Sequence, residues 1–143
     1  MYASTKLRKI REICNNNGHV IDECRIKKAC TSCNFSIQDA AQKLLKEENF
    51  KKQLVELSKI RGYYPSKNII SWCCEKKHFN HKKTLEYFIK ISESRKALIN
   101  KCQRINLLIT DDTLDNAIIV HYGYVPAAHK QLIQDFSCSP AHQ

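Results

Sequence analysis

Apolar residues recur every three or four positions through the central part of this chain, and this spacing limits the folds open to it. They stand at Ile37, Ala40, Ala41, Leu44, Leu45, Phe50, Leu54, Leu57 and Ile60. Residues three and four apart share one face of a helix, so the pattern predicts an amphipathic helix with one buried side. Strand-like alternation is scarce, and we therefore predict an all-α protein.

Start and stop signals divide the chain into several such helices. Ser36 with Asp39 three positions later resembles a capping box, and Pro65 ends the first long run. Further helical runs are expected at residues 66–79, 82–109, 111–124 and 126–136. The expected architecture is a compact bundle or a short stack of helical hairpins that follows a Cys/His-rich N-terminal segment.

The length of 143 residues predicts a single domain. Within it we distinguish a Cys/His-rich basic segment (1–35), basic helical hairpins (36–109) and an acidic C-terminal helix pair (110–143). The net charge is +13 up to Arg104 and −3 thereafter. A basic body attracts polyanions, so the expected partner is nucleic acid, RNA or DNA, bound non-specifically, or an acidic protein surface. A solvated, lysine-rich face is the alternative explanation.

Residues 69–91 carry a local resemblance. The string "CCEKKHFNHKKTLEYFI" resembles the inner-helix and outer-helix pattern of degenerate ankyrin-like repeats, although Lys77 replaces the turn glycine. Ala40–Ala41 stand 33 residues before Cys73–Cys74, which suggests that both pairs occupy the small-residue position of a first helix. The resemblance implies stacked helical hairpins, and an ordinary helical bundle is the alternative.

Cysteines are concentrated near the N-terminus. The pattern Cys14-x4-His19-x4-Cys24 resembles the last three ligands of a retroviral-type zinc knuckle, with Arg11 at the place of the first cysteine. Cys30 or Cys33 would complete the four ligands that a structural zinc ion needs. The expected cofactor is Zn²⁺. The alternative is that the thiols are unliganded and fill helix interfaces as small hydrophobic groups.

A second group of metal ligands is Cys74, His78 and His81. On a continuous helix Cys74 and His78 would lie one above the other, with His81 on the same side. Such a site would face electrostatic repulsion from Lys76, Lys77, Lys82 and Lys83.

Lysines and aromatic residues alternate in the same region, which favours a nucleic-acid interface. Lysines contact phosphates, and exposed rings stack on bases. The residues expected to bind nucleic acid are Lys51, Lys52, Lys59, Arg61, Tyr63, Tyr64, Lys76, Lys77, Lys82 and Lys83. Trp72, Phe79 and Tyr87 lie nearby in the sequence, and Phe79 is expected to pack in the core.

Catalytic motifs are missing from the sequence, and three glycines leave few tight turns for a phosphate loop. We therefore expect no enzyme. A secretory signal and an apolar stretch of membrane-spanning length are missing as well, so we expect an intracellular protein, in the cytoplasm or nucleus, that contacts no membrane. The expected function is that of a small, zinc-stabilised, nucleic-acid-binding regulatory protein. The alternative is a helical protein-interaction module, such as a viral or symbiont inhibitor of a host factor.

Overall fold

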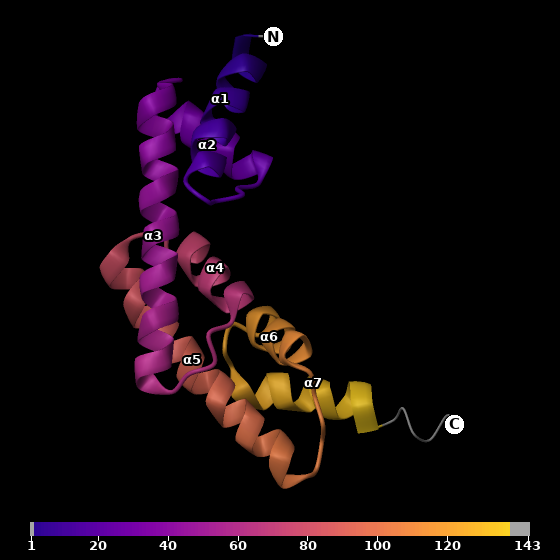
Figure 1. Ribbon diagram of the computed structural model, residues 1–143. Coiled ribbons are helices and arrows are strands. Elements are labelled where there is room, and N and C mark those ends of the chain that lie inside the picture. The colour runs from indigo at the N-terminus through magenta and orange to yellow at the C-terminus, as the bar shows by residue number, and fades with distance from the viewer. Residues whose placement is uncertain (1, 138–143) are drawn as a thin grey trace. The chain divides into compact units, whose positions relative to one another are not determined.

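The computed structural model describes residues 2–137, which form seven α-helices and no strand (Figure 1). The helices are α1 (Tyr2–Asn16), α2 (Glu23–Ser32), α3 (Ile37–Arg61), α4 (Lys67–Lys76), α5 (His81–Arg104), α6 (Asp111–Val120) and α7 (Val125–Ser137). The all-α prediction is confirmed for this part of the chain.

The chain divides into two compact units, residues 1–52 and 53–143, with a boundary inside α3. In unit 1, α1 and α2 lie beside the first half of α3 (Figure 1) and bury one apolar cluster with it. Its members are Ile10, Cys14, Ile21, Ile26, Ala29, Cys30, Ala40, Ala41 and Leu44.

Unit 2 contains the end of α3 and the two hairpins α4–α5 and α6–α7. Helix α5 contacts α4, α6 and α7, and α4 also contacts α6. Each of these four helices buries at least one large apolar side chain almost completely: Ile69, Phe88, Ile118 and Leu132. These four helices therefore pack against one another through buried apolar side chains, as the helical spacing of those residues requires.

The three helical hairpins repeat at an interval of 44 residues. Their first helices begin at Glu23, Lys67 and Asp111, and their second helices begin at Ile37, His81 and Val125. Each first helix has 10 residues. Its N-cap side chain accepts a hydrogen bond from the backbone amide three residues later, and the three N-caps are Asp22, Ser66 and Thr110. The same capping geometry therefore starts each hairpin.

The turns within the hairpins repeat at the same interval. Left-handed backbone angles occur at Asn34 and Phe35, at His78 and Phe79, and at Tyr122 and Gly123. In each turn the second of these residues donates its backbone N–H, over 2.8 Å, to the carbonyl oxygen five residues earlier. This bond pairs a carbonyl that the end of a helix leaves without an intrahelical partner.

Core positions also repeat, which explains where most of the cysteines lie. Three sets of equivalent, buried positions are Cys14/Ser58/Cys102, Ala29/Cys73/Ala117 and Cys30/Cys74/Ile118. In these sets cysteine takes the same place as alanine, serine or isoleucine. The buried thiols are thus accommodated as small core side chains.

The 33-residue register expected from the sequence is wrong. Ala40 and Ala41 lie on α3, the second helix of its hairpin, whereas Cys73 and Cys74 lie on α4, a first helix. Small residues occur on both helices because both approach the core closely, so their spacing alone does not give the repeat length.

The helix expected over residues 82–109 ends earlier, at Arg104. Asn106 takes a left-handed φ of 56°, and the backbone N–H of Leu107 donates to the carbonyl of Cys102 over 2.9 Å. The apolar run that follows leaves the helix, and Leu108 is 94% exposed. The prediction ran past Arg104 because apolar residues continue at helical spacing and no glycine or proline marks the end of the helix.

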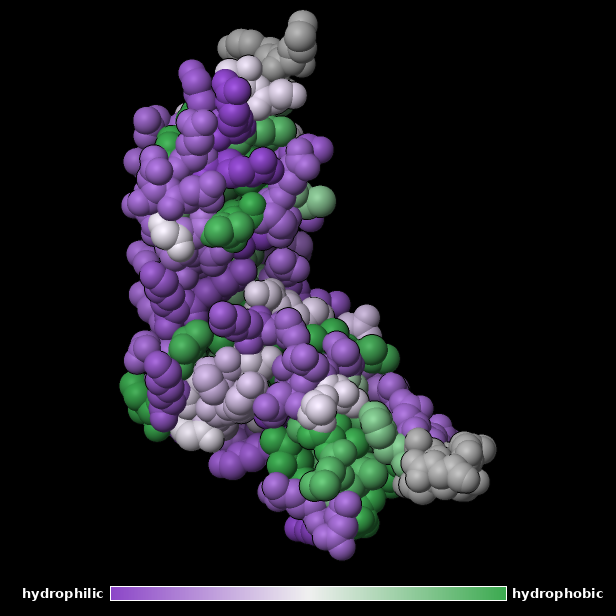
Figure 2. Space-filling model, turned by 45° about the vertical axis from the view of Figure 1, so that its right-hand side comes forward, coloured by the Kyte–Doolittle hydropathy of each residue, from purple (hydrophilic) through white to green (hydrophobic). Residues whose placement is uncertain are grey.

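Much of the surface in Figure 2 is hydrophilic, with a larger apolar area in the lower half of the view. Among the described residues, no helix combines the length and the apolar character that crossing a membrane requires.

Candidate functional site

Three aromatic rings and two lysines meet on unit 2, and we call them the aromatic–lysine surface: Trp72, Lys76, Lys77, Tyr87 and Tyr122. The ring centroid of Trp72 lies 5.5 Å from that of Tyr87 and 6.2 Å from that of Tyr122. Lys76 Nζ lies 4.8 Å from the Tyr122 centroid, and Lys77 Nζ lies 4.5 Å from the Tyr87 centroid. Both lysines are within cation–π distance of a ring.

The turn between α4 and α5 positions the lysines. Helix α4 ends at Lys76, and the chain reverses through the left-handed residues His78 and Phe79. Asn80 then starts α5 by accepting a hydrogen bond from the backbone amide of Lys83, over 2.9 Å. One turn therefore carries two lysine pairs, Lys76–Lys77 before it and Lys82–Lys83 after it.

The turn between α6 and α7 supplies the third ring. Tyr122 is equivalent to His78 in the 44-residue repeat, and its φ is 51°. Its side chain is 62% exposed, between Val120 and Tyr124, which are 60% and 65% exposed. Two successive hairpin turns thus contribute to one surface, and most of the Tyr122 ring faces solvent.

The lysines at this surface keep their positive charge available. The ion pairs that described lysines make involve Lys27, Lys51 and Lys59. Among residues 2–137, the four lysines that flank the α4–α5 turn form no ion pair with a carboxylate.

The Tyr87 hydroxyl of the same surface has a raised pKa. Burial is the main cause, followed by Cys73 and Tyr122.

The remaining basic residues expected to bind nucleic acid are divided between the two units. Lys51 and Lys52 belong to unit 1, and Lys59 and Arg61 belong to unit 2. Lys51 and Lys59 each form an ion pair with a glutamate of α3, whereas Lys52 and Arg61 are exposed.

The expectation that Tyr63 is a surface ring is wrong. Its side chain is only 9% exposed, and its hydroxyl donates a hydrogen bond of 2.6 Å to the Glu93 carboxylate. The neighbouring Tyr64 is 51% exposed. Its ring centroid lies 4.5 Å from Cζ of Arg95, so one face of the ring covers a guanidinium group.

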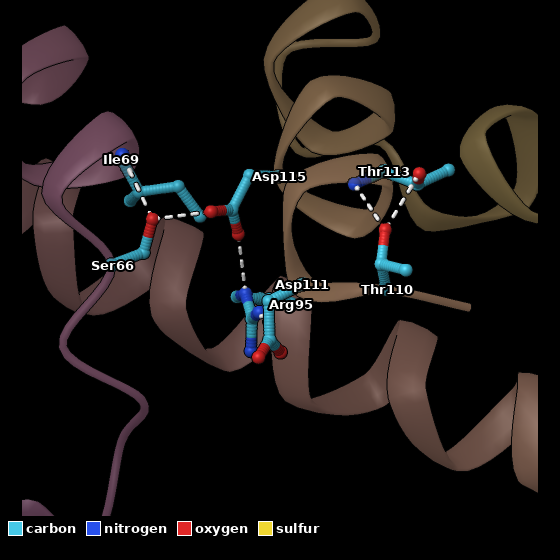
Figure 3. Close-up of polar contacts among 7 residues, drawn as sticks. All are labelled: Ser66, Ile69, Arg95, Thr110, Asp111, Thr113 and Asp115. Atoms are coloured by element: carbon cyan, nitrogen blue, oxygen red, sulfur yellow. Dashed lines mark hydrogen bonds and ion pairs between the residues drawn. The ribbon is translucent and has the colours of Figure 1, made fainter. Parts of the chain in front are cut away.

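Arg95 belongs to a buried polar network that joins α4, α5 and α6 (Figure 3). Its Nε donates to Asp115 over 2.7 Å, and its Nη2 donates to Asp111 over 2.8 Å. The Ser66 hydroxyl donates to the second oxygen of Asp115 over 2.5 Å. Arg95 is 4% exposed and Asp115 is 2% exposed. The network gives hydrogen-bond partners to polar and charged groups, whose burial would otherwise cost free energy of folding.

The residues expected to bind zinc in unit 1 have different environments. Cys14 and Cys30 are buried in the apolar cluster, His19 and Cys33 are partly exposed, and Cys24 is exposed. Within residues 2–137, no three histidine, cysteine or acidic side chains are grouped as metal ligands. The zinc site stays a prediction, and the burial of Cys14 and Cys30 agrees with the packing alternative.

The second expected ligand group rested on a helix face that the structure does not form. Cys74 is buried on α4, but the helix ends at Lys76, and His78 has a left-handed φ of 52°. His81 is the first residue of α5. The turn therefore separates Cys74 from the two exposed histidines, and the three residues do not share one side of a helix.

Two features of the candidate site and its surroundings carry no local signal in the sequence. Tyr122 lies 44 residues after His78, and only the repeat interval would have shown that their turns are equivalent. The Arg95–Asp115 pair joins two helices across 20 residues, a spacing with no local sequence signal.

Comparisons with models of protein families, with curated proteins and with solved structures find no match to this chain. Residues 2–137 form an all-α arrangement of helical hairpins with a 44-residue repeat, and unit 2 carries the aromatic–lysine surface.

Proposed function

We propose that the protein binds nucleic acid without strong sequence preference and that the aromatic–lysine surface makes the contact. The observation that carries this proposal is the meeting of Lys76, which forms no ion pair among residues 2–137, with the exposed Tyr122 ring of the next hairpin turn. The net charge of +10 adds a long-range attraction to polyanions.

The chemistry of the surface suits a flexible, single-stranded ligand. Lysines that contact phosphates release condensed counterions, which favours binding at low salt. A base that stacks on Tyr122 gains about 1–3 kcal/mol of stacking energy and needs no particular sequence. The lysines on either side of the α4–α5 turn would follow the backbone while the ring holds one base.

The test is a titration of fluorescent single-stranded RNA at several salt concentrations. Replacing Lys76, Lys77, Lys82 and Lys83 by glutamine should weaken binding and make the slope of log affinity against log salt shallower by up to about 3, since each lost contact contributes about 0.7 on single strands. A matched control replaces the exposed lysines Lys28, Lys46, Lys90 and Lys130, which removes the same total charge.

The aromatic contribution has its own control. Tyr122→Leu should weaken binding several-fold with little change in slope, whereas Tyr124→Leu, a change at a comparably exposed tyrosine, should have less effect. Equal losses in the two lysine variants would contradict a defined surface. No binding of RNA or duplex DNA at low salt would overturn the proposal altogether.

A further inference from the structure

Each hairpin is preceded by a loop that exposes one apolar residue at the same position. The loops contain a left-handed residue at Gly18, Gly62 or Asn106. Two positions later, Val20 is 93% exposed, Tyr64 is 51% exposed and Leu108 is 94% exposed. A single exposed apolar residue is ordinary, but its recurrence at three equivalent positions is not explained by packing. In repeat proteins, binding residues often lie on loops at equivalent positions of the repeats.

In unit 2 the ring of the loop residue Tyr64 packs against Arg95, which holds it in place. Its ring covers the Arg95 guanidinium, which the carboxylates of Asp111 and Asp115 fix (Figure 3). The Asp111 carboxylate is the first cause of a raised pKa for the Tyr64 hydroxyl, followed by burial. A ring fixed in this way loses little conformational freedom when a partner binds to it.

Tyr64 lines two hollows. The first has a volume of about 180 Å³ and is lined by Tyr63, Tyr64, Ser92 and Ile99, with Lys96 also contributing. The second, about 330 Å³, lies between the start of α4 and the start of α6. At about 180 Å³ the first hollow is smaller than the pockets that hold cofactors, so it suits one side chain.

The polar groups of the first hollow indicate what would enter it. Ser92 is 6% exposed, and its hydroxyl has no hydrogen-bond partner among residues 2–137. Arg95 is already paired with two carboxylates, whereas Lys96 is exposed and makes no ion pair within the described residues. The charged group at this hollow that forms no ion pair is therefore the Lys96 ammonium, and the apolar side chain of Ile99 lines the same hollow.

We propose that this hollow binds a polypeptide partner through a bulky apolar side chain followed closely by a carboxylate. The apolar side chain packs against Tyr64 and Ile99, a polar group of the partner segment bonds to Ser92, and the carboxylate pairs with Lys96. This site is separate from the residues of the aromatic–lysine surface, and it needs no nucleic acid.

The test selects binders to the full chain from a random library of 12-residue peptides. The expected consensus is an apolar residue followed within one or two positions by aspartate or glutamate. Binding of the selected peptides should weaken about tenfold with Lys96→Glu, because the change replaces an attraction by a repulsion. Lys90→Glu, at an exposed lysine of the same helix, should have little effect.

A second selection on the Lys96→Glu variant makes the result independent of folding defects. It should enrich apolar–basic peptides in place of apolar–acidic ones. Selection without a consensus, or peptides that bind the Lys96→Glu variant as tightly as the parent chain, would overturn the proposal.

Discussion

Asp115 bonds to two other elements of unit 2. It is 2% exposed, pairs with Arg95 and accepts the hydroxyl of Ser66, the N-cap of α4. Asp115→Ala would leave a buried guanidinium with only the half-exposed Asp111 as its partner. We expect a loss of about 3–5 kcal/mol in the free energy of unfolding, measured by urea denaturation.

The control for this variant is Asp112→Ala, at an exposed position on the same helix. Removal of a helix N-terminal charge should cost less than about 1 kcal/mol. A loss for Asp115→Ala no larger than that for Asp112→Ala would contradict the predicted stabilisation by the buried network.

Cys73 links stability to pH. Burial, with a smaller contribution from Cys74, raises the pKa of its thiol from 9.0 to about 12. Between these values the unfolded chain loses a proton that the folded chain keeps, so the unfolded state binds fewer protons and stability falls as pH rises. Urea denaturation from pH 8.5 to 10.5 should show this decline.

Cys73→Ala identifies the residue responsible. Alanine occupies the equivalent positions 29 and 117, so the variant should fold, and its stability should decline less steeply above pH 9. Cys24→Ala removes an exposed thiol and is the matched control. If both variants declined as steeply as the parent chain, Cys73 would not be the linked group.

At the scale of the elements, the end of α6 depends on Gly123. Its φ is +79°, and an added Cβ would lie 2.6 Å from Cδ1 of the buried Ile91 on α5. Gly62 has a φ of +75° but nothing within 4 Å of an added Cβ. Both alanine variants should suffer the left-handed backbone cost of about 1–2 kcal/mol. Gly123→Ala should lose at least about 1 kcal/mol more because it also overpacks the core.

Denaturation of the two glycine variants side by side measures this difference. Equal losses would mean that Ile91 moves aside at no cost and that the α6–α7 turn tolerates a side chain. A larger loss for Gly123→Ala would show that close packing between α5 and the turn fixes the third hairpin.

At the scale of the whole molecule, the helical class was predictable because apolar spacing is a property of each helix alone. The repeat was not predictable, because equivalent positions share burial and not residue type: Ala40, Thr84 and Ala128 are all buried, yet two of the three are alanine and one is threonine. The lysines of the candidate site were found because they are neighbours in sequence. Tyr122 and Arg95 were not, since their partners come from other helices.

The constant interval between hairpins has a consequence for how such a chain can change in length. An inserted or deleted segment of 44 residues, such as residues 61–104, would bring every later N-cap and left-handed turn into the place of an equivalent one. A segment of another length inserted within a helix would shift the residues after it away from the equivalent core positions. Duplication of one hairpin is therefore a change of length that this architecture accommodates well, and each added copy would bring its own N-cap, its own left-handed turn and its own exposed loop residue.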